Sequence, residues 1–192
     1  GTTGDGDSCT VRVPPHRVEE LPLHLARFHG CGLGDVFSEQ QGRAILAARL
    51  VSLTQGYSGV TPALLDRLTV FINDNIVPVI PQEGSVGASG DLTPLSYIAA
   101  TLMGERDVFY AGDRRPALHV LNELPLKPLT LRPKEGLALM NGTAVMTALA
   151  CIAFVRADYL AQLAARITSM MSLALQGNAN HFDAKLFSVK PH

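Results

Sequence analysis

The chain has 192 residues, of which 47% are hydrophobic and 17% are charged, and its formal net charge is −1. This length suits one domain or one large part of a domain, and the apolar composition predicts extensive buried helix or a large subunit interface. The near-neutral charge gives no electrostatic reason to expect nucleic acid or a membrane surface as a partner.

The three cysteines, Cys9, Cys31 and Cys151, are far apart and lack the spacing of metal ligands. They indicate reduced thiols in a cytoplasmic protein, with no metal site. The most apolar run covers residues 143–155, which is 13 residues. A membrane-spanning helix needs about 20 residues, so we interpret this run as part of a buried helix.

Helices are predicted in the first part of the chain from apolar periodicity and from capping signals. The second helix opens on a capping box, with Ser38 at the N-cap and Gln41 three residues later. The third opens on Thr61 as cap, with Pro62 in the first helical position. The predicted ranges are residues 17–28, 38–55 and 61–71, followed by an extended segment over 78–81.

A run of very small residues, GSVGASGDL at 84–92, interrupts this apolar sequence. Its glycines free the backbone torsions and let other backbone approach closely. It resembles a phosphate cradle at first sight. However, it has no Gly-Lys-Ser/Thr end, no G-x-G-x-x-G pattern, and Asp91 occupies the last position that a G-x-S-x-G elbow would need.

A different chemistry fits Ala88-Ser89-Gly90. If a tight turn presses the amide nitrogen of Gly90 onto the carbonyl carbon of Ala88, a five-membered ring closes with loss of water. Gly90 lacks the Cβ that would obstruct this attack. Loss of the Ser89 hydroxyl as a second water leaves a 4-methylidene-imidazol-5-one, an electrophile that no ordinary side chain provides.

After this loop, Asp91 suits the N-cap of a helix that extends to residue 104. The positive end of this helix would raise the electrophilicity of such a ring.

Residues 107–115 predict a short surface hairpin with its turn at 111–113. Asn141-Gly142 is typical of a turn before a helix, and residues 143–176 predict one long helix that neighbouring helices or subunits bury on nearly every face.

The loop GSVGASGDL and the segment KEGLALMNGT at 134–143 closely resemble two motifs of the histidine and aromatic amino-acid ammonia-lyases and the related aminomutases. The resemblance implies an all-α fold, a long-helix bundle with a glycine-rich prosthetic-group loop and a short surface β-hairpin. It also implies that residues 1–192 form the N-terminal part of a longer chain, which would be inactive alone.

By this resemblance, Ala88, Ser89 and Gly90 form the prosthetic group, and Asn141 hydrogen-bonds near it and near the amino end of the substrate. Phe28 and His29 occupy the pair of positions that selects the substrate ring. The histidine is similar to that of histidine ammonia-lyases, whereas the phenylalanine is more like that of members that use phenylalanine.

The N-terminal sequence departs from the family. Thr3, Gly4 and Gly6 match the end of a Tyr-Gly-x-x-Thr-Gly-Phe-Gly motif, but Asp5 stands in place of the usual aromatic residue, and the tyrosine, which is the catalytic base of the family, would precede residue 1. Tyr57 lies in a further matching turn, where an anchored structural role is expected and a catalytic role is the alternative.

The implied reaction is elimination of ammonia from an L-aromatic amino acid, most like L-histidine giving trans-urocanate as in histidine catabolism, in a cytoplasmic homotetramer. The substrate amine would add to the methylidene group, and a tyrosine would remove the β proton. The alternatives within the family are a 2,3-aminomutase and a phenylalanine or tyrosine ammonia-lyase. Outside it, a catalytically silent helical scaffold and an anion-binding loop at 84–90 stay open.

The proposed ring chemistry predicts a mass. The tryptic peptide that carries residues 88–90 should be lighter by two waters than its sequence requires, as measured by mass spectrometry of the intact natural protein. An undehydrated peptide from the full-length chain would favour the silent scaffold.

Overall fold

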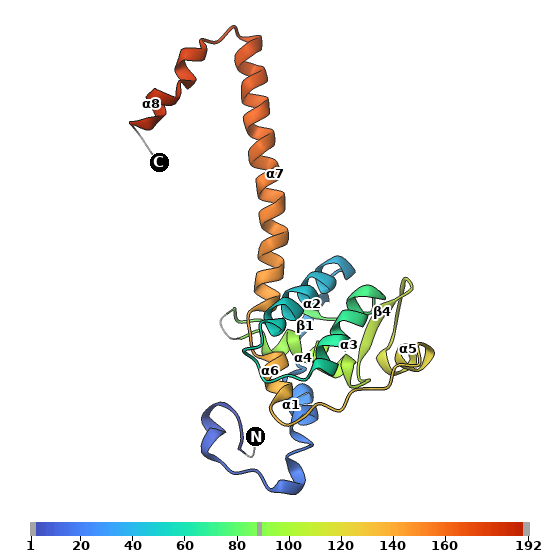
Figure 1. The fold of residues 1–192 in the computed structure, drawn as a ribbon. Coiled ribbons are helices and arrows are strands. Elements are labelled where there is room, and N and C mark those ends of the chain that lie inside the picture. Colours follow the sequence, from blue (N-terminus) through green and yellow to red (C-terminus); the bar gives the residue numbers. More distant parts are fainter. Residues whose placement is uncertain (1–2, 88–89, 190–192) are drawn as a thin grey trace. The chain divides into compact units, whose positions relative to one another are not determined.

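The computed structural model describes residues 3–87 and 90–189, and it divides the chain into two units, Gly1–Ala150 and Cys151–His192. Helices dominate both units, as the ribbon in Figure 1 shows. The predicted helical fold class is therefore confirmed.

The helices of the first unit surround α4, Leu92–Leu102, in which every residue from Pro94 to Leu102 is buried. Because this helix is apolar on all sides, it forms the centre of the core, and α1, α5 and α6 pack against it. The surrounding helices are α1 Leu21–His29, α2 Glu39–Thr54, α3 Pro62–Asn73, α5 Ala117–Glu123 and α6 Glu135–Met140. Short 3₁₀ helices precede them at Gly6–Thr10 and Pro15–Arg17.

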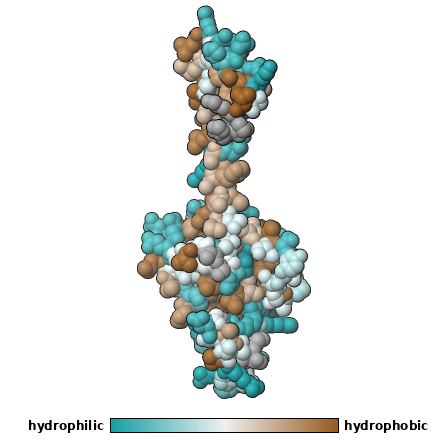
Figure 2. All heavy atoms as spheres, turned by 90° about the vertical axis from the view of Figure 1, so that its left-hand side faces the viewer, coloured by the Kyte–Doolittle hydropathy of each residue, from teal (hydrophilic) through white to brown (hydrophobic). Residues whose placement is uncertain are grey.

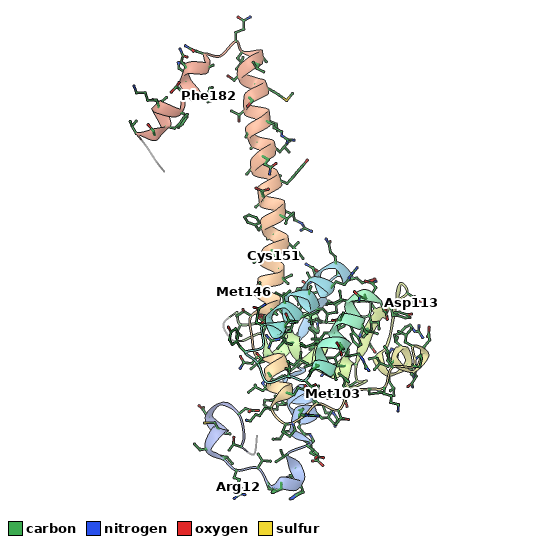
Figure 3. All side chains as sticks on the ribbon, in the orientation of Figure 1. Arg12, Met103, Asp113, Met146, Cys151 and Phe182 are labelled. Atoms are coloured by element: carbon green, nitrogen blue, oxygen red, sulfur yellow. The ribbon has the colours of Figure 1, made fainter. Side chains whose placement is uncertain are left out.

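Two small antiparallel sheets complete the first unit. In one sheet, β1 (Leu33–Val36) pairs with β3 (Pro81–Glu83), which leads into the glycine loop. In the other, the strand order is β2-β4-β5, and β4 (Asp107–Tyr110) and β5 (Asp113–Pro116) form the predicted hairpin. β2 is Val77–Pro78. Figure 3 labels Asp113 at the hairpin turn.

The capping predictions had mixed outcomes. The capping box of α2 is present, because Ser38 Oγ accepts from the amide of Gln41 at 3.3 Å and Gln41 Oε1 accepts from the amide of Ser38 at 2.9 Å. Thr61 occupies the predicted N-cap position of α3, with Pro62 after it, but its side chain makes no capping hydrogen bond. Its hydroxyl instead donates to the buried carboxylate of Glu135 at 2.7 Å, which ties the start of α3 to α6.

The long helix α7, Ala144–Ala174, begins within two residues of its predicted start. Its first turns bury Ala144, Val145 and Ala148, but from Cys151 onward its side chains are mostly exposed. The predicted burial by neighbouring helices is not found among the described residues of this chain, and burial by other subunits stays a prediction. The second unit continues with a 3₁₀ helix, Ala179–Phe182, and α8, Ala184–Ser188, and Figure 2 shows hydrophobic side chains on its surface.

Among the described residues, α7 is long and apolar enough to cross a membrane by length and composition alone. Its best 18-residue window has a mean hydropathy of 1.6. The 13-residue apolar run is the first part of this helix, which continues through Arg156 and Asp158, in agreement with the predicted range 143–176.

Candidate functional site

The glycine loop is closed on itself at its base. The amide of Val86 donates to the carbonyl of Gly90 at 3.4 Å, and the amide of Gly87 donates to Ser85 Oγ at 3.2 Å. Gly87 has a φ of +78°, a left-handed conformation that favours glycine. The predicted ring precursors Ala88 and Ser89 lie outside the described residues. Their flanks, Val86 and Gly90, are joined by the backbone hydrogen bond at the base of the loop.

Asp91 lies directly after the loop and is fully buried. The prediction placed it at the N-cap of α4, and it occupies that position, but its side chain makes no capping hydrogen bond there. Its carboxylate instead accepts from the amides of Val145 at 2.9 Å and Met146 at 3.1 Å, at the start of α7, and from the hydroxyl of Ser85. One carboxylate therefore joins the glycine loop to α7.

Asn141 lies beside the same loop. It ends α6 in an extended conformation, and Gly142 after it forms an isolated parallel bridge with Gly90. The backbone that carries Asn141 thus runs alongside the last of the three predicted ring residues.

A cavity of about 550 Å³ opens next to Asn141. Three predicted site residues, Phe28, His29 and Asn141, all line this cavity, although they come from α1 and from the end of α6. The remaining lining residues are Gly4, Asp5, Gly6, Ser8, Leu21, His24, Leu25, Leu92 and Leu137. Apolar side chains with a few polar groups among them are typical of small-molecule sites.

The rings of Phe28 and His29 meet edge to face, with centroids 5.1 Å apart. His29 Nδ1 lies 3.0 Å from the carbonyl oxygen of Leu25. Because a carbonyl only accepts, Nδ1 carries the proton, and in the neutral ring Nε2 is then a hydrogen-bond acceptor.

Asp5 also lines this cavity, and it forms an ion pair with Lys134. The ammonium group of Lys134 donates to the carbonyl of Gly4 at 2.9 Å as well. Lys134 therefore ties the N-terminal segment to the start of α6. The resembled motif has an aromatic residue at this position. Asp5, which stands there, is paired with Lys134.

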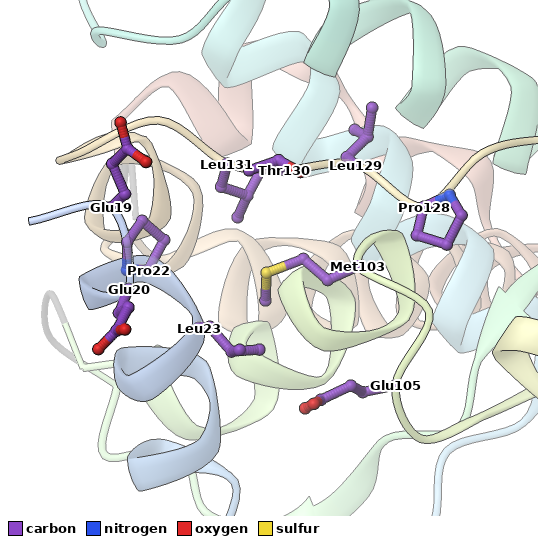
Figure 4. Close-up of a pocket in the computed structure, with 10 residues that line it drawn as sticks. All are labelled: Glu19, Glu20, Pro22, Leu23, Met103, Glu105, Pro128, Leu129, Thr130 and Leu131. Carbon is purple, nitrogen blue, oxygen red and sulfur yellow. The ribbon is translucent and has the colours of Figure 1, made fainter. Parts of the chain in front are cut away.

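A second cavity, of about 350 Å³, contains none of the predicted site residues. Figure 4 shows it between the start of α1, the end of α4 and the segment 128–131, with Glu19, Glu20 and Glu105 around an apolar floor. Glu105 forms an ion pair with Arg27.

Arg49 was not among the site residues predicted from the sequence, although the sequence contains a signal for it. Arg49 lies within the apolar stripe of α2 between Leu46 and Leu53, and a charge at such a position is unusual unless it is paired inside the protein. It is only 3% exposed, and it contacts the end of α6. Tyr57 was interpreted wrongly as an anchored residue, because it is 95% exposed in this chain.

The helical fold matches solved structures of ammonia-lyases and aminomutases of aromatic amino acids. A sequence profile of the aromatic amino acid lyases matches residues 1–192. The chain belongs to the aromatic amino acid lyase family.

Individual relatives act on different amino acids. The chain is 43% identical to a histidine ammonia-lyase of Geobacillus thermodenitrificans over 188 residues, which cover 98% of this chain and 37% of that protein. It is similar to the tyrosine aminomutase of Streptomyces globisporus, with 42% identity, a TM-score of 0.87, and coverage of 96% of this chain and 34% of that one. The phenylalanine aminomutase of Pantoea agglomerans gives 31% identity and a TM-score of 0.91, covering 100% and 37%.

The chain thus spans a little over a third of the length of the curated relatives it matches.

The position of Asp91 predicts a large loss of stability on substitution. Asp91→Ala removes the acceptor of three hydrogen bonds and leaves buried donors unpaired, so the free energy of unfolding should fall by about 3 kcal/mol or more. Chemical denaturation measures this change. The exposed Asp66 of α3 provides the matched control, because Asp66→Ala should change the same quantity by less than about 0.5 kcal/mol. Equal effects of the two substitutions would contradict the assignment.

Proposed function

We propose that the protein eliminates ammonia from an L-aromatic amino acid, most like L-histidine, to give the trans-unsaturated acid. The observation that carries the proposal is that Phe28, His29 and Asn141 line one cavity, while the residue after Asn141 pairs with Gly90. In this reaction the bond between the α carbon and nitrogen breaks, a β proton is lost, and a carbon–carbon double bond forms.

Ala88, Ser89 and Gly90 are proposed to form a 4-methylidene-imidazol-5-one, with no metal. The described flanks fit this group, because the hydrogen bond between Val86 and Gly90 closes the loop around the precursors and because Gly90 has no Cβ to obstruct its amide. When formed, the group supplies an electrophile for the substrate amine.

The side chains of this chain would bind and orient the substrate. His29 Nε2 would accept a hydrogen bond from a ring N–H or O–H, and Phe28 would contact the ring face or edge. Asn141, whose amide both donates and accepts, would hold the amino end near residues 88–90.

A 2,3-aminomutase is the second candidate, because two of the similar solved structures are aminomutases. It would return the ammonia to the β carbon of the same unsaturated acid. The phenylalanine or tyrosine ammonia-lyase reaction is a third candidate, which Phe28 beside His29 favours.

The active protein is proposed to be a cytoplasmic homotetramer in which residues 1–192 form the N-terminal part of a longer chain. The exposed apolar side chains of α7 support this assembly, because subunit contacts would remove them from water. They include Phe154, Val155, Tyr159, Leu160, Ile167 and Met170. Alone, this chain is proposed to be inactive.

The lyase proposal predicts that the full-length protein converts L-histidine to urocanate, detected by its ultraviolet absorbance, with slower turnover of L-tyrosine and L-phenylalanine. Ser89→Ala should abolish turnover and leave the helical circular dichroism unchanged. A β-amino acid as the main product would favour the aminomutase. Retained turnover in Ser89→Ala would rule out the proposed electrophile.

The orientation of His29 predicts a change in substrate preference. His29→Leu removes the acceptor, so kcat/KM for L-histidine should fall by about tenfold or more, because the ring N–H loses its partner in the cavity. The value for L-phenylalanine, which has no ring donor, should fall much less. His119→Leu on the exposed face of α5 is the control, with both values unchanged. A parallel loss for both substrates would show that His29 does not recognise the ring.

A further inference from the structure

Arg49 extends from the middle of α2 to the end of α6. Its Nε donates to the carbonyl of Leu139 at 2.7 Å, and its Nη2 donates to the carbonyls of Asn141, at 2.9 Å, and Ala138. The last carbonyls of a helix have no partner within the helix, and a cation near them is favourable. One guanidinium group therefore completes the hydrogen bonding at the end of α6.

The next residue, Gly142, leaves space for this guanidinium because it has no side chain. A Cβ on Gly142 would lie 2.3 Å from Arg49 Nη1, so the side chain packs directly on the glycine backbone. Arg49 thus contacts the chain on both sides of the Asn141 peptide. These contacts restrain the backbone torsions of Asn141, which set the direction of its side chain.

Burial lowers the pKa of the Arg49 guanidinium, and the charge of nearby Asp91 opposes that effect. An arginine stays cationic even so. Burying this charge is costly unless its hydrogen bonds are made, which gives the guanidinium a strong preference for this one arrangement of the three carbonyls.

We propose that Arg49 is a positioning residue that fixes the Asn141-Gly142 backbone beside Gly90, so that Asn141 lines the cavity. Arg49 and Asn141 border another cavity, of about 600 Å³, but Arg49 is only 3% exposed and its guanidinium donates to three backbone carbonyls, so its role is to act through Asn141. The inference rests on the proposed lyase function, in which Asn141 holds the amino end of the substrate.

The test compares Arg49 with Arg67 in the full-length protein. Arg67 of α3 also donates to a backbone carbonyl, that of Lys127 at 2.7 Å, and burial lowers its pKa too, but it is remote from Asn141. Arg67→Met therefore controls for the loss of an arginine–carbonyl contact as such. Arg49→Lys accompanies Arg49→Met, because it keeps the charge if the methionine variant does not fold.

The rate kcat is calculated per protein molecule in which residues 88–90 are dehydrated. Mass spectrometry of the peptide gives that fraction. Both Arg49 variants should lower kcat by about tenfold to a hundredfold, since a displacement of about 1 Å at a positioning group has effects of this size. A lysine cannot reproduce the planar fork that spans the carbonyls. Arg67→Met should lower the melting temperature and leave kcat within about twofold of the wild type.

A double-mutant cycle separates positioning from a general loss of stability. In the Asn141→Ala background, Arg49→Lys should change kcat by less than about twofold, because the group it positions is gone. Equal effects of Arg49→Lys in the two backgrounds would overturn the proposal. So would an unchanged kcat in Arg49→Lys with only a lower melting temperature.

Hydrogen exchange keeps this proposal distinct from the lyase proposal. The amides of Gly142 and Thr143 should exchange faster in Arg49→Lys than in Arg67→Met, whether or not the protein is active. If the wild type turns over no aromatic amino acid, the lyase proposal fails and this exchange alone decides the backbone role of Arg49. Unchanged exchange would overturn it.

Discussion

The arrangement of the site depends on two buried charges that lie on either side of the turn between α6 and α7. Arg49 binds the last carbonyls of α6, and Asp91 binds the first amides of α7. Each charge stabilises the helix end of opposite partial charge, so the turn between the two helices, residues 141–143, is held from both directions. The glycine loop is held by the same carboxylate, through Ser85. Any displacement of the turn would therefore break contacts that water cannot replace inside the protein.

Local signals predicted most of the helices and the β4–β5 hairpin. The capping box at Ser38 and the hairpin turn are correct because the residues that decide them are adjacent in sequence. Thr61 and Asp91 were expected to cap the helices that they precede, by the same logic. The side chain of Thr61 instead binds a group 74 residues away, and that of Asp91 binds a group 54 residues away. A local sequence pattern cannot predict partners at such a distance. The site residues were predicted by resemblance to a family, whereas their common cavity required the fold.

At Arg49 and in α7, the hydrophobic pattern of the sequence does not identify what surrounds the side chains. Arg49 lies in an apolar stripe that the pattern assigned to the core, and the core there contains the polar end of α6. The apolar composition of α7 predicts burial, but among the described residues most side chains of this helix from Cys151 onward are exposed. Composition reports that a side chain avoids water. It does not report which partner removes it from water.

The fixed turn also affects the chemical lifetime of the protein. In an Asn-Gly sequence, the glycine amide nitrogen can attack the side-chain carbonyl carbon of the asparagine and release ammonia, which leaves a cyclic imide that water opens to aspartate or isoaspartate. This ring closure needs rotation about the bond between the Asn141 Cα and its carbonyl carbon, where ψ is 112°. Arg49 donates a hydrogen bond to that carbonyl, and the rotation would break it. The chain thus restrains one backbone cyclisation beside a loop whose sequence suits another.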